Sequence, residues 1–276
     1  MHGGIDLEQR KKTIQEKMLK IKNKIIVMSG KGGVGKTTIS VNLGYGLSKM
    51  GYKVGILDAD LHGPNVPIML GKEGIKLSKL SNPMEINENL KITSLSFFVP
   101  DENPIIWRGP QKLGAIQEML LYVEWGEIDF LIVDLPPGTG DETLTIAQDI
   151  GKDARTIIVT TPQKVALLDS RRSVKFSKLL NLQPLGIIEN MSGFVCPDCN
   201  QVVDIFKKGG AEEMALETKT TFLGAIPMDK NVVEAGDNGC PYVENENSMA
   251  TVEMNKIIKR ILTYLDVSKL EEKWKY

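Results

Sequence analysis

The chain has 276 residues, of which 42% are hydrophobic, and its 34 basic and 35 acidic side chains give a formal net charge of −1. This length can bury the core of one large α/β domain, and the balanced charge provides no overall basic surface for nucleic acid. No apolar run approaches the roughly 20 residues that cross a bilayer. The balanced charge and the short apolar runs lead us to expect neither a nucleic-acid nor a membrane partner. Three cysteines, an odd number in a long chain, argue against a disulfide framework, so we expect a cytoplasmic protein.

The first predicted element is a basic segment near the N-terminus. Residues 10–24 carry seven basic side chains, with Ile14, Met18 and Ile21 at helical spacing. An anionic partner would fit this charge, and so would a solvated helix whose apolar stripe packs on the core. We expect the second arrangement, with residues 1–23 as an extension docked on the domain that residues 24–276 form.

A phosphate-binding loop follows the first predicted strand, residues 25–28. Residues 29–38 read SGKGGVGKTT and fit G-x-x-x-x-G-K-[ST] at every fixed position. Glycines let the backbone wrap an anion, and the N-terminus of the next predicted helix, residues 38–50, adds partial positive charge. We expect Lys36 to reach the β- and γ-phosphates of ATP and Thr37 to bind Mg²⁺. The other loop residues expected to contact the nucleotide are Gly30, Lys31, Gly32, Gly33, Val34, Gly35 and Thr38.

Carboxylates end two further predicted strands, residues 53–58 and 130–134. Asp134 follows an apolar run, as is typical of the second magnesium-organising motif of phosphate-loop NTPases. We expect Asp58 to support the same magnesium ion and Asp60 to position or activate the attacking water. Aspartates that end strands also form turns, which is the alternative for both.

A stiff and then flexible loop, residues 135–141, comes after Asp134. Its two prolines and two glycines suit a segment that senses the γ-phosphate through the backbone N–H of Gly138. Asp141 is a candidate cap for a helix that follows.

Short apolar runs alternate with longer amphipathic segments through the rest of the chain. The additional strands are predicted at residues 90–98, 156–160, 185–188 and 223–226, and the helices at residues 112–123, 165–180 and 254–276. Continuous apolar strands imply a sheet covered on both faces, and intervening helices imply parallel crossovers. The predicted fold is a doubly wound, mostly parallel α/β sheet that binds its ligand at the carboxyl ends of the strands.

The sequence Cys196-Pro-Asp-Cys199 places two thiols where they can bind one metal centre from one side. A redox pair would favour a helix N-terminus after the first cysteine, whereas residues 200–205 resemble a strand or turn. Zinc or a [4Fe–4S] cluster requires four ligands, and we expect the third cysteine, Cys240, to be a small buried hydrophobe. A two-fold dimer would supply the missing pair, and two inert thiols are the remaining alternative.

The extra lysine of the phosphate loop, Lys31, narrows the class. The string KGGVGKTT is similar to the deviant loop of the family that includes nitrogenase iron protein, MinD, ParA and the iron–sulfur carrier ATPases. This resemblance implies that Lys31 reaches across a dimer interface to the nucleotide of the partner. A solvated loop lysine is the alternative.

Further strings resemble the Mrp/ApbC branch of iron–sulfur cluster carrier ATPases from residue 24 to about residue 265. They are residues 58–60 with 63–65, 107–110, 134–142, 189–193, 196–199 and 226–229. The resemblance implies that Asn190 recognises adenine and that Cys196 and Cys199 of two chains bridge a [4Fe–4S] cluster. It further implies a homodimer that hands clusters to apo-proteins. We expect slow, Mg²⁺-dependent ATP hydrolysis, with Lys31, Lys36 and Asp60 as the catalytic residues.

Two alternative functions remain open from the sequence. A MinD- or ParA-like partitioning ATPase would share the nucleotide site, and its membrane anchor would look like the apolar stripe of residues 254–276. Such an ATPase needs no cysteines at its interface. The second alternative is the same ATPase with a structural zinc at the cysteine pair, because both centres accept thiolates.

Overall fold

The computed structural model describes residues 7–60, 63–98, 109–197, 199, 201–205 and 207–267. Parts of the expectations for residues 1–23, 107–110, 196–199 and 254–276 therefore lie outside the described residues. The division into an extension and an ATPase domain stays a prediction. The α-helices are α1 (Leu7–Leu19), α2 (Lys36–Lys49), α3 (Val66–Met69), α4 (Gly109–Tyr122), α5 (Asp141–Ile150), α6 (Lys164–Leu179), α7 (Gly210–Glu217), α8 (Lys230–Asp237) and α9 (Met249–Tyr264).

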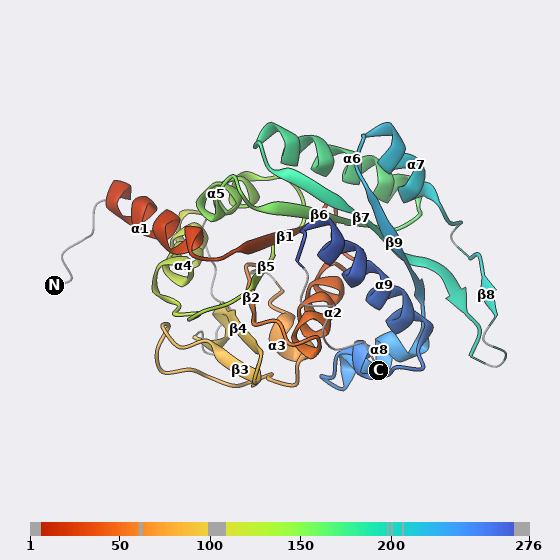
Figure 1. Ribbon diagram of the computed structural model, residues 1–276, viewed down its shortest axis with the longest axis horizontal. Helices are drawn as coiled ribbons and strands as arrows, with labels where there is room; N and C mark the ends of the chain where they lie inside the picture. The colour runs from red at the N-terminus through yellow and green to blue at the C-terminus, as the bar shows by residue number, and fades with distance from the viewer. Residues whose placement is uncertain are drawn as a thin grey trace.

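A single twisted sheet runs through the described part of the chain (Figure 1). Its strands are β1 (Asn23–Ser29), β2 (Val54–Asp58), β3 (Met84–Asn87), β4 (Leu90–Ser94), β5 (Phe130–Asp134), β6 (Arg155–Thr160), β7 (Gln183–Val195), β8 (Val202–Val203) and β9 (Phe222–Met228). The order is β3-β4-β2-β5-β1-β6-β7-β8, and β9 also pairs with β7. Among the strands of the described residues, only β3 and β8 pair antiparallel to their neighbours, so the predicted mostly parallel fold is confirmed.

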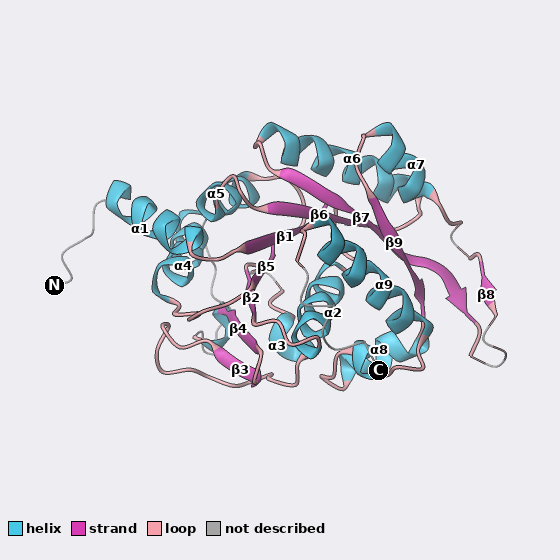
Figure 2. Ribbon diagram, viewed as in Figure 1, coloured by secondary structure: helices cyan, strands magenta, loops and turns pink. Residues whose placement is uncertain are grey.

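Helices cover both faces of this sheet (Figure 2). Side chains alternate along each strand, so Ile25 and Val27 of β1 pack in the core beneath α2 and α9. Ile26 and Met28 point to the opposite face, into the core formed with α1, α4 and α5. Because parallel strands in such a sheet share one carboxyl edge, the loops after β1, β2 and β5 meet there.

The N-terminal helix α1 packs against α4 and α5 (Figure 1). Ile14 and Met18 are 0% and 2% exposed. The Lys24 side chain is fully buried, and its Nζ donates to Met18 O at 2.8 Å and pairs with Asp153. This lysine ties the end of α1 to the loop that precedes β6.

At the other end of the described chain, α9 lies against β9 and α2. Its apolar stripe, including Met254, Ile258 and Leu262, is buried in the same core as Ile25. Among the described residues, no helix combines the length and apolar character needed to cross a membrane. Core packing thus accounts for the stripe as far as Tyr264.

Several predicted boundaries were wrong. The strand predicted over residues 90–98 ends at Ser94, because the Ser94 side chain accepts a hydrogen bond from Ser96 N and begins the 3₁₀ turn Leu95–Phe97. The strand predicted over residues 185–188 is part of β7, which runs through 13 residues. The position before α5 is taken by Gly140, and Asp141 lies inside the first turn.

The docking of α1 predicts a large loss of stability when its buried face is trimmed. Ile14→Ala should lower the free energy of unfolding by about 2–4 kcal/mol, since it leaves a cavity between α1 and the core. Leu19→Ala is the matched control, because Leu19 lies on the same helix and is 72% exposed. Urea denaturation measures both. Equal, small losses in the two variants would show that α1 does not contribute to the core in solution.

Candidate functional site

The loop between β1 and α2 adopts a conformation that glycine makes possible. Gly35 has φ +83° and caps α2, and a Cβ there would lie 2.1 Å from Asn190 Nδ2. At Gly30, a Cβ would lie 2.3 Å from the backbone of Asp169 in α6. Two of the predicted loop glycines are therefore needed for close approach of neighbouring elements. Lys31 is half-buried, and its carbonyl oxygen accepts a hydrogen bond from Ser29 Oγ.

Asp134 forms the polar centre of the site. It ends β5 with its side chain 0% exposed, and Lys36 Nζ lies 2.7 Å from its Oδ2. Thr37 Oγ1 donates to the same oxygen at 2.7 Å, and Ser40 Oγ donates to Oδ1 at 2.6 Å. The structure thus brings together Lys36, Thr37 and Asp134, as the sequence predicted.

Asp58 lies beside Asp134, because β2 and β5 pair in parallel with these two residues in register. Its carboxylate accepts hydrogen bonds from Ser94 Oγ and from the backbone N–H of Asp60. Burial raises the pKa of the Asp58 carboxyl well above its usual range, and Asp134 raises it further, against the opposing effect of Lys36. Asp60 itself is half-buried at the start of the following loop.

Gly138 occupies a backbone conformation with φ +92° in the loop after β5. Its N–H, which was expected to sense a γ-phosphate, donates to the carbonyl oxygen of Ser29 at 2.9 Å. The loop after β5 is therefore hydrogen-bonded to the first residue of the phosphate loop. Contact between this N–H and a phosphate would exchange one hydrogen bond for the other.

A cavity of about 530 Å³ opens at one side of the phosphate loop. Asn190 of β7 lines it, is 7% exposed, and donates through Nδ2 to Val34 O at 2.9 Å. Thr38, Met191 and Pro227 also line this space. The cavity has the position expected for a nucleoside whose phosphates lie on the loop, and its lining includes Asn190.

The cysteine pair lies at the turn of a hairpin formed by β7 and β8. Phe194 and Val195 of β7 pair with Val203 and Val202, and Cys196 N donates to Gln201 O at 2.9 Å. Cys196 is half-buried and Cys199 is exposed. In Figure 1 this hairpin extends away from the body of the sheet. Within the described residues, no group of three His, Cys, Asp or Glu side chains forms a complete metal site.

The prediction for Cys240 was wrong, because this cysteine is exposed. It follows α8, where Cys240 N donates to Ala235 O and the adjoining glycine lies against Gly71. The tight backbone turn leaves the thiol at the surface, and hydrophobicity alone could not reveal this.

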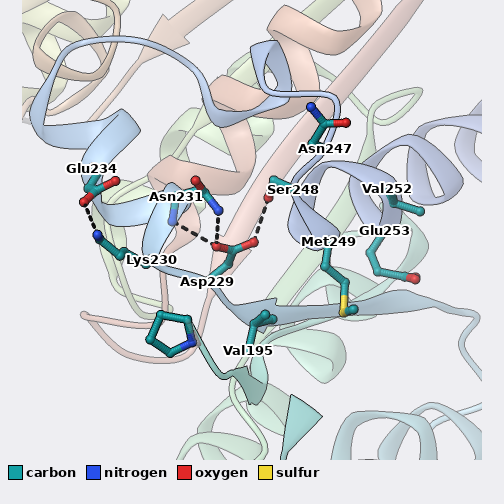
Figure 3. A pocket seen from close by; sticks show the side chains of 11 residues that line it. Val195, Asp229, Lys230, Asn231, Glu234, Asn247, Ser248, Met249, Val252 and Glu253 are labelled. Carbon is teal, nitrogen blue, oxygen red and sulfur yellow. Dashed lines mark hydrogen bonds and ion pairs between the residues drawn. The ribbon is translucent and has the colours of Figure 1, made fainter. Parts of the chain in front are cut away.

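A second cavity, of about 570 Å³, adjoins the cysteine hairpin at Val195 and Pro197 (Figure 3). Asp229 lies at its wall, where it caps α8 through Asn231 N and accepts a hydrogen bond from Ser248 Oγ. Burial acts to raise the pKa of Asp229, but hydrogen bonds from Asn231, Ser248 and Ala250 outweigh it and hold the pKa below its usual value. Asp229 and Lys230 also line the cavity at Asn190, so these two residues lie between the two spaces.

Sequence reasoning missed Ser40 and Ser94, which donate hydrogen bonds to the carboxylates of the site. It also missed Glu189, which accepts a hydrogen bond from the backbone at the start of α7. Ser40 was recoverable, since it lies one helical turn after Lys36 and therefore on the same side of α2 as the phosphate loop. Ser94 carries no local signal, because the parallel pairing of β4 with β2 is what places it beside Asp58.

Comparison with known proteins agrees with this geometry. The profile of the family described as "NUBPL iron-transfer P-loop NTPase" matches residues 20–262. The chain belongs to this family. It is 49% identical to the iron-sulfur cluster carrier protein of Methanocaldococcus jannaschii, covering 95% of this chain and 92% of that protein. The carrier protein of Saccharolobus solfataricus is 42% identical, with 92% and 87% covered. The resemblance to iron–sulfur cluster carrier ATPases is thereby confirmed.

Solved structures place the fold in the same group. The nucleotide-binding protein of Archaeoglobus fulgidus in complex with ADP has a TM-score of 0.74 and 37% identity, covering 87% of this chain and 95% of that chain. MinD of Pyrococcus horikoshii with Mg-ADP has a TM-score of 0.65 and 25% identity, with 87% and 95% covered. The MinD structures are thus more distant than the cluster carriers, and this member of the iron-transfer family shares their P-loop NTPase fold.

The buried pair of carboxylates predicts a stability cost that nucleotide-free protein should reveal. Asp58→Asn should raise the free energy of unfolding by about 1 kcal/mol at neutral pH. The raised pKa of Asp58 means that the folded state holds a proton which the unfolded chain has lost, so stability falls as the pH rises above the usual aspartate range. The gain from Asn should therefore shrink as the pH falls.

Urea denaturation over a range of pH values tests this expectation, with Asp237→Asn, a change at an exposed position, as the control. A variant Asp58→Asn that is less stable than the wild type at every pH would show that the ionised carboxyl supports the nucleotide-free fold.

Proposed function

We propose that this protein is a homodimeric, ATP-dependent carrier that holds one [4Fe–4S] cluster between two chains and transfers it to apo-proteins. The observation that carries the proposal is the cysteine pair. Cys196 and Cys199 lie at the turn of a hairpin on β7, the same strand that contributes Asn190 to the nucleotide cavity. The carrier names of the relatives support the same function.

Lys36 and Asp134 are the proposed core of the ATPase. Without a phosphate, the Lys36 ammonium neutralises Asp134, and with ATP bound it would turn toward the β- and γ-phosphates. Asp134 would then be free to organise Mg²⁺ together with Thr37, whose Oγ1 lies 2.7 Å from Asp134 Oδ2. Oxygen donors of this kind suit Mg²⁺, which screens the charge that develops during phosphoryl transfer.

The remaining catalytic groups surround this centre. Asp60 is proposed to position the attacking water, and Asp58 to support the magnesium ion from the neighbouring strand. Gly138 would exchange its bond to Ser29 for one to the γ-phosphate, which links the state of the nucleotide to the loop before α5. Lys31 would act on the nucleotide of the partner chain. We propose that hydrolysis by this set of groups is slow.

Recognition of the base would rest on Asn190. One N–H of its Nδ2 donates to Val34 O, which orients the amide, and the amide oxygen would then accept a hydrogen bond from the adenine N6 amine. Guanine carries an oxygen at the equivalent ring position, and two acceptors would then face each other. We therefore propose a preference for ATP over GTP.

The cluster is cargo that the protein carries. Two thiolates per chain provide half of the four ligands that a [4Fe–4S] cluster needs, and a two-fold axis places each pair opposite its copy. Exposure of Cys199 leaves the centre open to exchange with an acceptor. We further propose that this exchange takes place in the cytoplasm, without a nucleic-acid or membrane partner.

The nucleotide site predicts a specific loss of hydrolysis. Lys36→Ala should lower the rate of ATP hydrolysis by about 100-fold or more, because this variant removes the charge that faces the phosphates during transfer. Lys49→Ala is the matched control, since Lys49 lies on the same helix with a side chain 37% exposed. Phosphate release by the purified proteins measures both. If folded Lys36→Ala protein hydrolyses ATP as fast as the wild type, the proposed role of Lys36 in hydrolysis is wrong.

The cysteine site predicts a division among the three thiols. After anaerobic reconstitution with iron and sulfide, Cys196→Ala and Cys199→Ala should each lose the charge-transfer absorption of the cluster, because each removes two of the four ligands in the dimer. Cys240→Ala should keep it and serves as the control. A spectrum that survives the loss of both Cys196 and Cys199 would contradict the proposal, and zinc without iron would assign the site to a structural metal.

A further inference from the structure

Glu189 is a buried carboxylate with no part in the proposed hydrolysis. It lies on β7 one residue before Asn190 and is 0% exposed. Ser192 Oγ donates to its Oε1 at 2.6 Å, Gly209 N donates to the same oxygen at 3.0 Å, and Ala211 N donates to Oε2 at 2.7 Å. Among the described residues, no basic side chain forms an ion pair with it, so hydrogen bonds alone offset the cost of burying this polar group.

These donors lie on the two arms of the cysteine hairpin. Ser192 belongs to the outgoing arm, a few residues before Cys196, whereas Gly209 and Ala211 lie where the returning arm enters α7. Gly209 is the N-cap of α7 and provides no side chain, so Glu189 takes over the capping of this helix. One carboxylate therefore fastens both ends of the segment that carries Cys196 and Cys199.

The outgoing arm bends between the nucleotide cavity and the cysteines. Met191 has φ +57°, a left-handed conformation that side chains other than glycine rarely adopt, and Gly193 has φ +79°. The pairing of β7 with β9 shifts register between Asn190 and Phe194, which marks the same bend. Asn190 and Met191 line the nucleotide cavity, so the bend begins at the wall of that cavity. The hydrogen bond from Ser192 Oγ to Glu189 Oε1 spans this bend.

We propose that Glu189 is a positioning residue that holds the cysteine hairpin in a fixed relation to the base-binding cavity, so that nucleotide at Asn190 controls access to Cys196 and Cys199. A base that contacts Asn190 and Met191 would limit the movement of the bend. The hydrogen bonds of Glu189 to Ser192, Gly209 and Ala211 would in turn limit the movement of both arms of the hairpin. The role in cluster release rests on the proposed carrier function, but the coupling itself requires no cluster.

The test uses the reduced, cluster-free protein and measures the alkylation rate of each cysteine by mass spectrometry, with and without saturating Mg-ADP. ADP is chosen because the inferred path starts at the base and does not need the γ-phosphate. In the wild type, ADP should slow alkylation of Cys196 and Cys199 by about fivefold, a coupling of ordinary size. Alkylation of Cys240, which lies outside the hairpin, should not change and is the internal control.

Glu189→Gln keeps the shape of the side chain but replaces one acceptor oxygen with an NH₂ group, which donates hydrogen bonds and cannot accept them. This variant should still bind ADP, its two hairpin cysteines should react faster than those of the wild type, and ADP should no longer slow them. Asp149→Asn is the matched control, since Asp149 is also buried and accepts a hydrogen bond from Gln117, in a part of the fold away from the cysteine hairpin. It should behave like the wild type.

Protection by ADP that persists in Glu189→Gln, or that is missing from the wild type, would overturn the proposal. If Glu189→Gln does not fold, Ser192→Ala removes only the bond across the bend and should weaken the ADP effect on Cys196 and Cys199. Since iron is absent from every arm, a failure here leaves the carrier function intact. A failure of the carrier function would instead appear as missing iron in reconstituted protein.

Discussion

The buried carboxylate of Asp134 organises the nucleotide end of this molecule. It has no access to solvent and satisfies its charge through Lys36, Thr37 and Ser40, all in the first turns of α2. This arrangement exists because β5 lies between β1 and β2 in parallel register, which brings the phosphate loop and Asp58 to one edge. An unpaired carboxylate at this depth would be costly, so the lysine that we propose to contact the phosphates also stabilises the nucleotide-free site.

The opposite half of the sheet carries the proposed cluster site. β7 continues past the nucleotide cavity, bends at Met191 and leads to a hairpin with two thiols at its turn. A single strand and its turn thus contribute both Asn190 and Cys196. The nucleotide and the cargo would therefore be held by adjacent parts of one element, with Glu189 fixing the geometry between them.

Local patterns predicted the grouping of Lys36, Thr37 and Asp134, because each of the two segments that contribute them has a recognisable motif of its own. The loop from Gly30 to Thr38 and the strand that ends at Asp134 carry strong signals, and the parallel fold follows from the alternation of strands with helices. The extent of β7, the exposure of Cys240 and the roles of Ser94 and Glu189 depend on contacts between distant segments. The periodicity of a single sequence indicates local secondary structure and not contacts between distant segments, so these features could be identified only from the structure.

Native mass spectrometry of the anaerobically reconstituted protein with Mg-ATP tests the bridging cluster most directly, because it counts chains and metal in one particle. We expect two chains that share one [4Fe–4S] cluster, in keeping with two thiolates from each hairpin. A monomer that carries its own complete cluster, or a dimer with one metal centre in each chain, would contradict a cluster held between the two hairpins.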